Sequence, residues 1–187
     1  MTAGQPQALA GLIFDYGRTR YDPATGDVFP DAAPTLAALA ATHRLAIVSL
    51  VSGDDYPGRR AAREALLRDR DLARHFAAIH FGATDKDSLY RRALADLDLV
   101  ATRVAIVDDR VCRGIAWGNS NGATTIWFRN GRFRDELPDA TTGQPTDTIT
   151  TLAALPTVLG TDATAARGAR GSARSGDAAQ ARRGDTR

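Results

Sequence analysis

The chain has 187 residues, of which 43% are hydrophobic and 25% are charged, as in ordinary folded globular proteins. No apolar stretch approaches the roughly 20 residues that a membrane-spanning helix needs, and the single cysteine, Cys112, excludes an intramolecular disulfide bond. The net charge of +2 is unevenly spread: residues 161–187 hold six arginines and three aspartates and carry +3, so the rest carries −1 and gives no sign of a specific nucleic-acid partner.

Segments of strand and helix character alternate along the chain. Strands are predicted at residues 8–15, 44–50, 78–81, 103–107 and 124–128, and helices at residues 32–42, 59–76, 87–97, 110–120 and 151–159. Glycines and prolines mark residues 16–30 and 129–150 as loop-rich. Residues 161–187 lack large apolar side chains, so we expect a disordered tail there and one folded domain over residues 1–160.

This alternation predicts an α/β fold, in which a three-layer, Rossmann-like parallel sheet has helices on both faces. The connections between parallel strands are expected to be right-handed. Ligands of such sheets bind beyond the carboxyl ends of the strands. Polar residues at the strand ends are therefore the candidates for a functional site.

Four strand ends, or the loops after them, carry such residues: Asp15, Ser49, Lys86 and the pair Asp108–Asp109. A carboxylate can attack phosphorus, and two or three carboxylates can hold Mg²⁺, which prefers oxygen ligands. A serine hydroxyl and a lysine ammonium can bind phosphoryl oxygens and offset their charge. Lys86 is the only lysine among 24 basic residues, which indicates a position that needs a compact ammonium. The sequence therefore predicts a phosphate and magnesium site around Asp15.

The order of these residues resembles that of the haloacid dehalogenase (HAD) superfamily of phosphohydrolases, over residues 8–159. The motif LIFDYGRTR is similar to the first motif of the family. It implies that Asp15 is the catalytic nucleophile and that Thr19 falls on the family's threonine position. The strand LAIVSL implies that Ser49 binds phosphate.

The later motifs extend the resemblance to the metal site. Lys86, just ahead of a predicted helix in FGATDKDSLYRRAL, falls on the family's catalytic, phosphate-binding lysine. The motif VAIVDDRVCRGI puts Asp109 on the magnesium-binding acid, with Asp108 beside it. The resemblance thus implies that Mg²⁺ is held by Asp15, the backbone carbonyl of Gly17 and Asp109, together with Asp108.

The chain departs from the family pattern at three positions. Gly17 stands where most members have a second aspartate, a general acid and base of a kind worth roughly 10²–10⁴ in rate. Gly114 stands where many members have a further acid, and its absence weakens metal binding unless Asp108 substitutes. Arg18 stands where small or apolar residues are common, and it either clamps a phosphate bidentately or lies in solvent.

The resemblance implies a magnesium-dependent phosphohydrolase that acts on a phosphate monoester through an aspartyl-phosphate intermediate. Gly17 and Gly114 motivate the alternative, a degenerate HAD-like protein that binds phosphate or a partner without efficient turnover. A phospho-accepting signalling receiver is less well supported, because that fold places its acid pair after the first strand and here the pair follows the fourth.

Residues 16–48 and 50–85 leave no room for the cap domain that many family members carry. We therefore expect an open site, a phosphorylated small molecule or macromolecule as the partner, and a homo-oligomer wherever a second copy closes the site. The N-terminal residues lack the basic start and apolar run of a signal peptide. We expect a cytoplasmic protein with no membrane partner.

Overall fold

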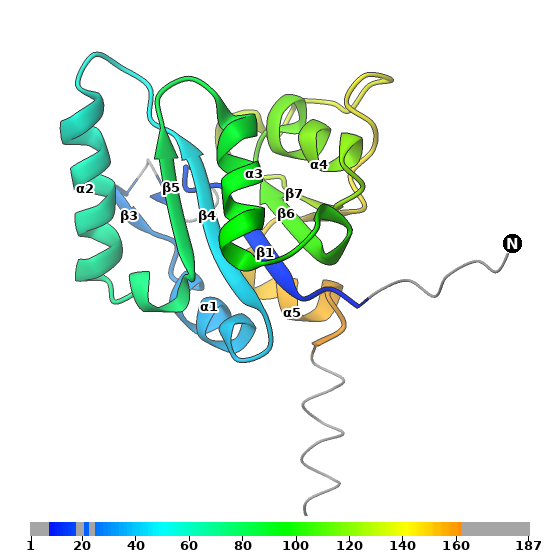
Figure 1. Ribbon diagram of the computed structural model, residues 1–187, viewed down its shortest axis with the longest axis horizontal. Helices are drawn as coiled ribbons and strands as arrows, with labels where there is room; N and C mark the ends of the chain where they lie inside the picture. The colour runs from blue at the N-terminus through cyan, green and yellow to red at the C-terminus, as the bar shows by residue number, and fades with distance from the viewer. Residues whose placement is uncertain (1–7, 18–20, 23–24, 162–187) are drawn as a thin grey trace, which may run out of the picture.

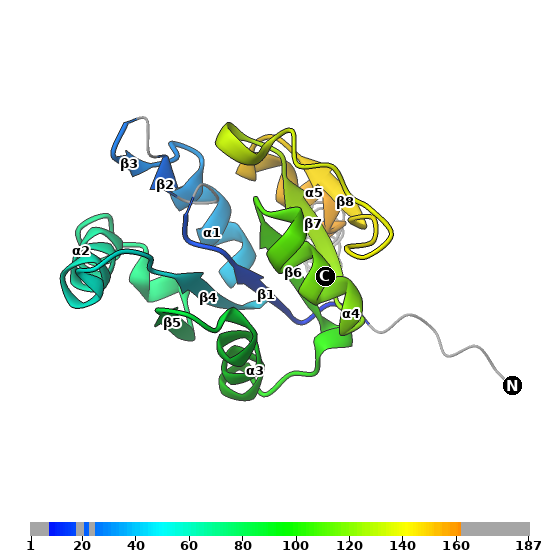
Figure 2. The ribbon, with the colours of Figure 1, turned by 90° about the horizontal axis from the view of Figure 1, so that it is seen from above.

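The computed structural model of the protein describes residues 8–17, 21–22 and 25–161. Its centre is a six-stranded parallel sheet with the strand order β5-β4-β1-β6-β7-β8. The strands are β1 (Gly11–Phe14), β4 (Arg44–Leu50), β5 (Ala78–Gly82), β6 (Val104–Asp108), β7 (Thr124–Phe128) and β8 (Asp147–Ile149). Helices lie on both faces of this sheet (Figure 1, Figure 2), which confirms the predicted α/β class.

The α-helices of the described residues are α1 (Ala32–Ala40), α2 (Tyr56–Asp69), α3 (Lys86–Leu97), α4 (Ala116–Ser120) and α5 (Leu155–Val158). In Figure 2, α1 and α5 lie on one face of the sheet, α3 and α4 lie on the other, and α2 lies at the β5 edge. Among the described residues, no helix is long and apolar enough to cross a bilayer.

Strand β1 is the middle of the core because all four of its residues are buried. Successive side chains of a strand point to opposite faces of the sheet. Leu12 and Phe14 accordingly pack in the cluster that includes Leu36 of α1, whereas Ile13 packs in the cluster that includes Ala93 of α3. The hydrophobic burial of both faces fixes the register of β1 and hence the position of the residue that follows it.

That following residue is Asp15, which emerges between two neighbouring strands. Phe14 pairs with Ile47 of β4 and with Val107 of β6, and the Asp15 backbone N–H donates to Val107 O at 2.9 Å. The ends of β4 and β6, which carry Ser49 and Asp108, therefore lie on either side of Asp15.

Helix α2 begins at Tyr56, three residues before the predicted start at residue 59. Asp55 precedes it and accepts a hydrogen bond from Gly58 N at 3.0 Å, and Pro57 occupies the first turn, where a missing N–H costs nothing. The helix ends at Asp69, and a separate 3₁₀ turn, Ala73–His75, follows where a continuous helix to residue 76 was expected.

Three further elements differ from the sequence-based expectation. The predicted loop at 16–30 contains a short antiparallel hairpin, β2 (Tyr21–Asp22) with β3 (Asp27–Val28). The predicted loop at 129–150 contains β8, which pairs with β7 at the sheet edge. The helix expected at 110–120 begins as a π-helical turn, Val111–Ile115, before α4. The predicted disordered tail at 161–187 lies outside the described residues, apart from Thr161.

Candidate active site

The centre of the site is a buried lysine held between two carboxylates. Lys86 Nζ donates to Asp15 Oδ1 at 2.6 Å and to Asp108 Oδ2 at 2.7 Å. The Lys86 side chain is 8% exposed and that of Asp108 is fully buried. Charged groups this deep need partners of opposite charge. The only lysine of the chain is thus placed where its compact ammonium bridges the two acids.

The start of helix α3 positions this lysine. Lys86 is the first residue of α3, and Asp85 before it accepts hydrogen bonds from Asp87 N at 2.9 Å and Ser88 N at 3.2 Å. The same contacts with Ser88 and Asp87 hold the pKa of Asp85 below its usual value. This cap fixes the direction in which α3 starts and hence where Lys86 points.

The electrostatics of the trio follow from burial and charge. Burial raises the pKa of Asp15 and outweighs the opposing effects of the Lys86 ammonium and the Ser49 hydroxyl. Burial alone would lower the pKa of Lys86, but Asp108 and Asp15 together hold that pKa well above its usual value. Lys86 therefore remains a cation that offsets the charge of the carboxylates.

Asp108 serves mainly to hold its neighbours. Its Oδ2 accepts from Lys86 and from the Tyr90 hydroxyl at 3.1 Å, and its Oδ1 accepts from Arg110 N at 2.9 Å. Burial, together with the nearby Asp108, raises the pKa of Tyr90 well above its usual value, so the hydroxyl remains a donor. Tyr90 in turn stacks on Trp117, with ring centroids 4.4 Å apart.

The absence of an acid at position 114 has a steric cause. An ideal Cβ placed on Gly114 would lie 2.5 Å from both the Cβ and the Cγ of Asp108, closer than real side chains approach. Gly114 is itself buried within the π-helical turn. The Asp108 carboxylate thus occupies the space that a side chain at position 114 would need.

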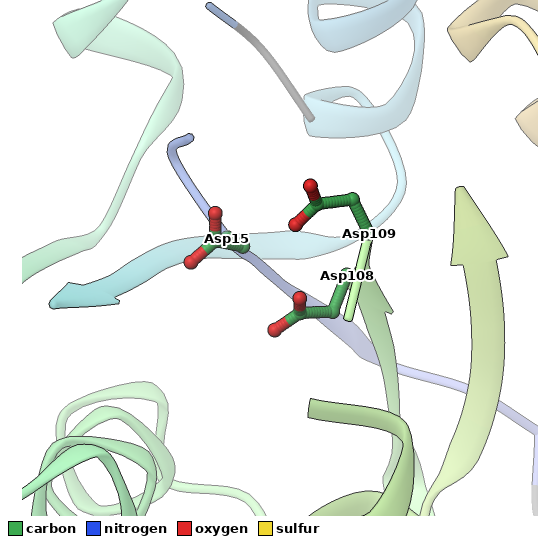
Figure 3. A group of neighbouring side chains, drawn as sticks. All are labelled: Asp15, Asp108 and Asp109. Atoms are coloured by element: carbon green, nitrogen blue, oxygen red, sulfur yellow. The ribbon is translucent and has the colours of Figure 1, made fainter. Parts of the chain in front are cut away.

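The three aspartates of the site form a donor set that fits a divalent cation. Asp15, Asp108 and Asp109 each offer a carboxylate oxygen within 4.8 Å of the others, and Figure 3 shows the three side chains converging from the ends of β1 and β6. Clustered carboxylate oxygens suit Mg²⁺. Gly17 lines one cavity together with Asp15 and Asp109. A Cβ on Gly17 would make only an ordinary contact, 3.5 Å from Asp15 Oδ2.

Arg63 is a site residue that the sequence did not reveal. From the middle of α2 its Nη1 donates to Ser49 Oγ at 3.1 Å and to Leu50 O at 3.0 Å. Its guanidinium also lies 4.9 Å from the centre of the Tyr16 ring. It therefore reaches the ends of both β4 and β1, beside the predicted phosphate-binding serine.

These groups open into a cavity of about 510 Å³. Its lining includes Asp15, Gly17, Ser49, Lys86 and Asp109, together with Arg59, Arg63, Arg110, Arg113 and Phe133. Arg110 is held by Glu136 at 3.1 Å and lies 3.9 Å from the centre of the Phe133 ring. The segment after β7 thus returns to form part of the cavity wall.

The structure therefore brings most of the predicted site residues together at the carboxyl ends of the central strands. One cavity is lined by Asp15, Ser49, Lys86, Asp109 and Gly17. Asp108 accepts a hydrogen bond from Lys86 behind this lining. Arg18 and Thr19 lie outside the described residues. Only a small hairpin and α1 lie between β1 and β4, and only α2 and one 3₁₀ turn lie between β4 and β5, so the described residues contain no cap domain.

Comparison with known proteins relates this site to one family. Residues 86–155, which carry Lys86 and the acid pair, match the family model described as HAD-hydrolase-like. This part of the chain is similar to HAD-like hydrolases. No curated protein matches the sequence.

Several solved structures share its fold. A HAD phosphatase from Thermococcus onnurineus is 24% identical, with a TM-score of 0.54, over 71% of this chain and 58% of that one. The putative HAD-hydrolase YfnB from Bacillus subtilis, bound to magnesium, is 21% identical, with a TM-score of 0.55, over 71% of this chain and 56% of that one. The L-2-haloacid dehalogenase from Xanthobacter autotrophicus is 14% identical, with a TM-score of 0.63, over 81% of this chain and 98% of that one.

These similarities support a HAD-like hydrolase fold for this chain. The chain spans less than two thirds of the phosphatase and of YfnB, at 58% and 56% of their lengths. Phosphatases and dehalogenases are both among the similar structures, so the reaction has to be argued from the residues of the site.

Proposed function

We propose that the protein is a magnesium-dependent phosphohydrolase that acts on phosphate monoesters through an aspartyl-phosphate. The observation that carries the proposal is the contact of Lys86 Nζ with Asp15 Oδ1 at 2.6 Å, at the wall of a cavity that Ser49 and Arg63 also line. A nucleophilic carboxylate beside fixed cationic and hydroxyl donors is the arrangement that phosphoryl transfer requires.

In the first step, a carboxylate oxygen of Asp15 attacks phosphorus while the bond between phosphorus and the ester oxygen breaks. The leaving oxygen takes a proton from water, because Gly17 offers no acid at the usual position. Ser49, Lys86 and Arg63 bind the phosphoryl oxygens, on which charge accumulates. In the second step, water attacks the aspartyl-phosphate, releasing inorganic phosphate and restoring the Asp15 carboxylate.

The residues that would hold Mg²⁺ are Asp15, Asp109 and the backbone carbonyl of Gly17. We assign Asp108 a minor role in metal binding, because its two carboxylate oxygens already accept three hydrogen bonds. When bound, the cation offsets the negative charge of the phosphoryl group. The three clustered carboxylates within 4.8 Å support this assignment.

The absence of a cap domain from the described residues bears on the substrate. An open cavity admits a phosphorylated small molecule or the exposed phosphate of a macromolecule. A second copy of the chain would exclude water from such an open site, and we propose a homo-oligomer as the form in which turnover is fastest. We propose the cytoplasm as its location.

The test is metal-dependent release of phosphate from 4-nitrophenyl phosphate by the full chain. Phosphate release with Mg²⁺ that stops on chelation, and that is lost in Asp15→Asn, is the expected result. Asp135→Asn is the matched control, because this exposed aspartate lies outside the cavity lining. No turnover across a broad panel of phosphate esters, or chloride release from a 2-haloacid in its place, would overturn the proposal.

Gly17 motivates a second candidate function, a HAD-like protein that binds phosphate without efficient turnover. Gly17 offers no acid or base at this position, whereas Ser49, Lys86 and Arg63, to which we assign phosphate binding, line the cavity. Calorimetric binding of inorganic phosphate, combined with no turnover on the same panel, is the result that favours this second function.

A further inference from the structure

Two arginines of the cavity have no part in the chemistry described so far. Arg59 is in the first turns of α2 and Arg113 is in the π-helical turn after β6. Both side chains line the cavity that contains Asp15. Two segments that lie far apart in the sequence thus each contribute an arginine to the lining of one cavity.

The other cations of this cavity already have partners. Lys86 is paired with Asp15 and Asp108, Arg110 is paired with Glu136, and Arg63 donates to Ser49 and Leu50 at the strand end. Within the described ranges, Arg59 and Arg113 form no ion pair with a carboxylate. Arg59 and Arg113 therefore line the cavity as cations that no carboxylate of the described residues pairs with.

The position of Arg59 is fixed by the loop beneath it. Its Nη1 donates to Ser52 O at 3.1 Å. Gly53 has a φ of +112°, and a Cβ there would lie 3.0 Å from Arg59 Cζ. The guanidinium thus lies directly over a glycine that leaves space for it. One of its five N–H donors is used in this contact, and the others are available to a ligand.

Composition alone does not assign a role to these residues, because arginine is the ordinary surface cation of this chain. Position distinguishes them. Arg68 is exposed on the same helix as Arg59 and does not line the cavity. A guanidinium binds carboxylates and phosphates through paired N–H donors, which suits a fixed anionic group of a ligand.

We propose that Arg59 and Arg113 bind a second anionic group of the substrate, a phosphate or a carboxylate, while its first phosphoryl group lies at Asp15. This inference rests on the proposed function and specifies its substrate class, phosphate monoesters that carry another anion. Since the described residues contain no cap domain, these two side chains supply the selectivity.

Inert ligands test the inference separately from turnover. Phenylphosphonate presents one anionic group, phosphonobenzoate adds a carboxylate, and benzenediphosphonate adds a second phosphonate, with the meta and para ring isomers covering different spans. Calorimetry with Mg²⁺ measures the affinity of each for the full chain. We expect one of the two kinds of ligand with a second anionic group to bind at least about tenfold more tightly than phenylphosphonate. A tenfold difference in affinity equals about 1.4 kcal/mol. Tighter binding of phosphonobenzoate would identify the second anionic group as a carboxylate, and tighter binding of benzenediphosphonate would identify it as a phosphate.

The variants Arg59→Ala and Arg113→Ala locate the effect. Each variant is expected to lose most of the preference for the ligand with two anionic groups while binding phenylphosphonate as before. Arg68→Ala is expected to retain the preference. Equal affinities for all ligands, or a preference that survives both cavity substitutions, would overturn the inference while leaving the phosphoryl site intact. Failure of every ligand to bind, phenylphosphonate included, would instead sink the proposed function and the inference together.

Discussion

The Asp108 side chain and Gly114 fit together so closely that a Cβ at position 114 would lie 2.5 Å from Asp108 Cγ. An acid at position 114 and the present conformation of Asp108 therefore exclude each other. The Asp108 carboxylate, which accepts a hydrogen bond from Lys86, thus occupies the space that a side chain at position 114 would need.

Gly114→Ala is expected to destabilise the fold, because overpacking a buried site costs about 1–3 kcal/mol. Urea denaturation measures the free energy of unfolding of the variant against the unaltered chain. Gly17→Ala is the matched control, since a Cβ there is 3.5 Å from its nearest neighbour. Equal stability of the two variants would contradict the steric account.

Lys86→Met is expected to lower the free energy of unfolding by about 3–5 kcal/mol, because it leaves two buried carboxylates without their shared cation. The double variant Lys86→Met/Asp108→Asn removes one of those charges and is expected to recover part of the loss. A double-mutant cycle by chemical denaturation isolates the coupling. Strictly additive effects of the two substitutions would argue against the pairing of Lys86 with Asp108.

Gly17→Asp is expected to raise kcat on 4-nitrophenyl phosphate roughly 10²-fold or more, because general acid–base help is typically worth about 10²–10⁴ in rate. A Cβ at position 17 would make only an ordinary contact, 3.5 Å from Asp15 Oδ2. A gain from near zero would favour the binding protein without turnover as the native function. An unchanged kcat would mean that water or another group already transfers the protons.

Arg63→Ala is expected to weaken binding of inorganic phosphate about tenfold or more, because hydrogen bonds to charged groups contribute about 1.5–3 kcal/mol. Arg63→Lys keeps the positive charge but lacks the paired N–H donors of the guanidinium. It is therefore expected to bind phosphate more tightly than Arg63→Ala and less tightly than the unaltered chain. Circular dichroism controls for folding, since Arg63 also contacts Leu50 O. Full affinity in Arg63→Ala would restrict this residue to a structural role.

Asp139 has a pKa lowered to about 2 by hydrogen bonds from Thr141 and Thr142. The ionised form therefore stabilises the turn at pH values above the usual value of 3.8, and this contribution is lost as pH falls through about 2. An NMR titration of the Asp139 carboxyl carbon is expected to show this low pKa, with Asp135 as the comparison. Titration near 3.8 would contradict the turn geometry.

Most of the fold was predictable because five strands of the central sheet are apolar runs bounded by polar or glycine residues. Strand β8 was missed because its three residues, Asp147–Ile149, have no apolar pattern of their own, and they are held by pairing with β7 and by the burial of Ile149 in the core. The π-helical turn was missed for a similar reason: the packing of Gly114 on Asp108 is tertiary and leaves no local periodicity.

The site was predictable where side chains follow strands, since the carboxyl ends of parallel strands meet. Arg63 was missed because it follows Ser49 by 14 residues, inside a helix whose exposed face is rich in arginine. Nothing in its local sequence distinguishes it from Arg60, which pairs with Glu64 at 2.7 Å. Only the packing of α2 against the sheet edge separates their roles.

The central place of β1 also governs the order in which the molecule can assemble. Residues 11–14 are translated well before one of their two neighbours, β6, residues 104–108. Pairing across so long a stretch of chain is slow, because loop-closure entropy must be offset before the contact forms. On the ribosome, one edge of this apolar strand therefore stays unpaired until residues 104–108 have been translated, and an unpaired apolar strand edge favours aggregation.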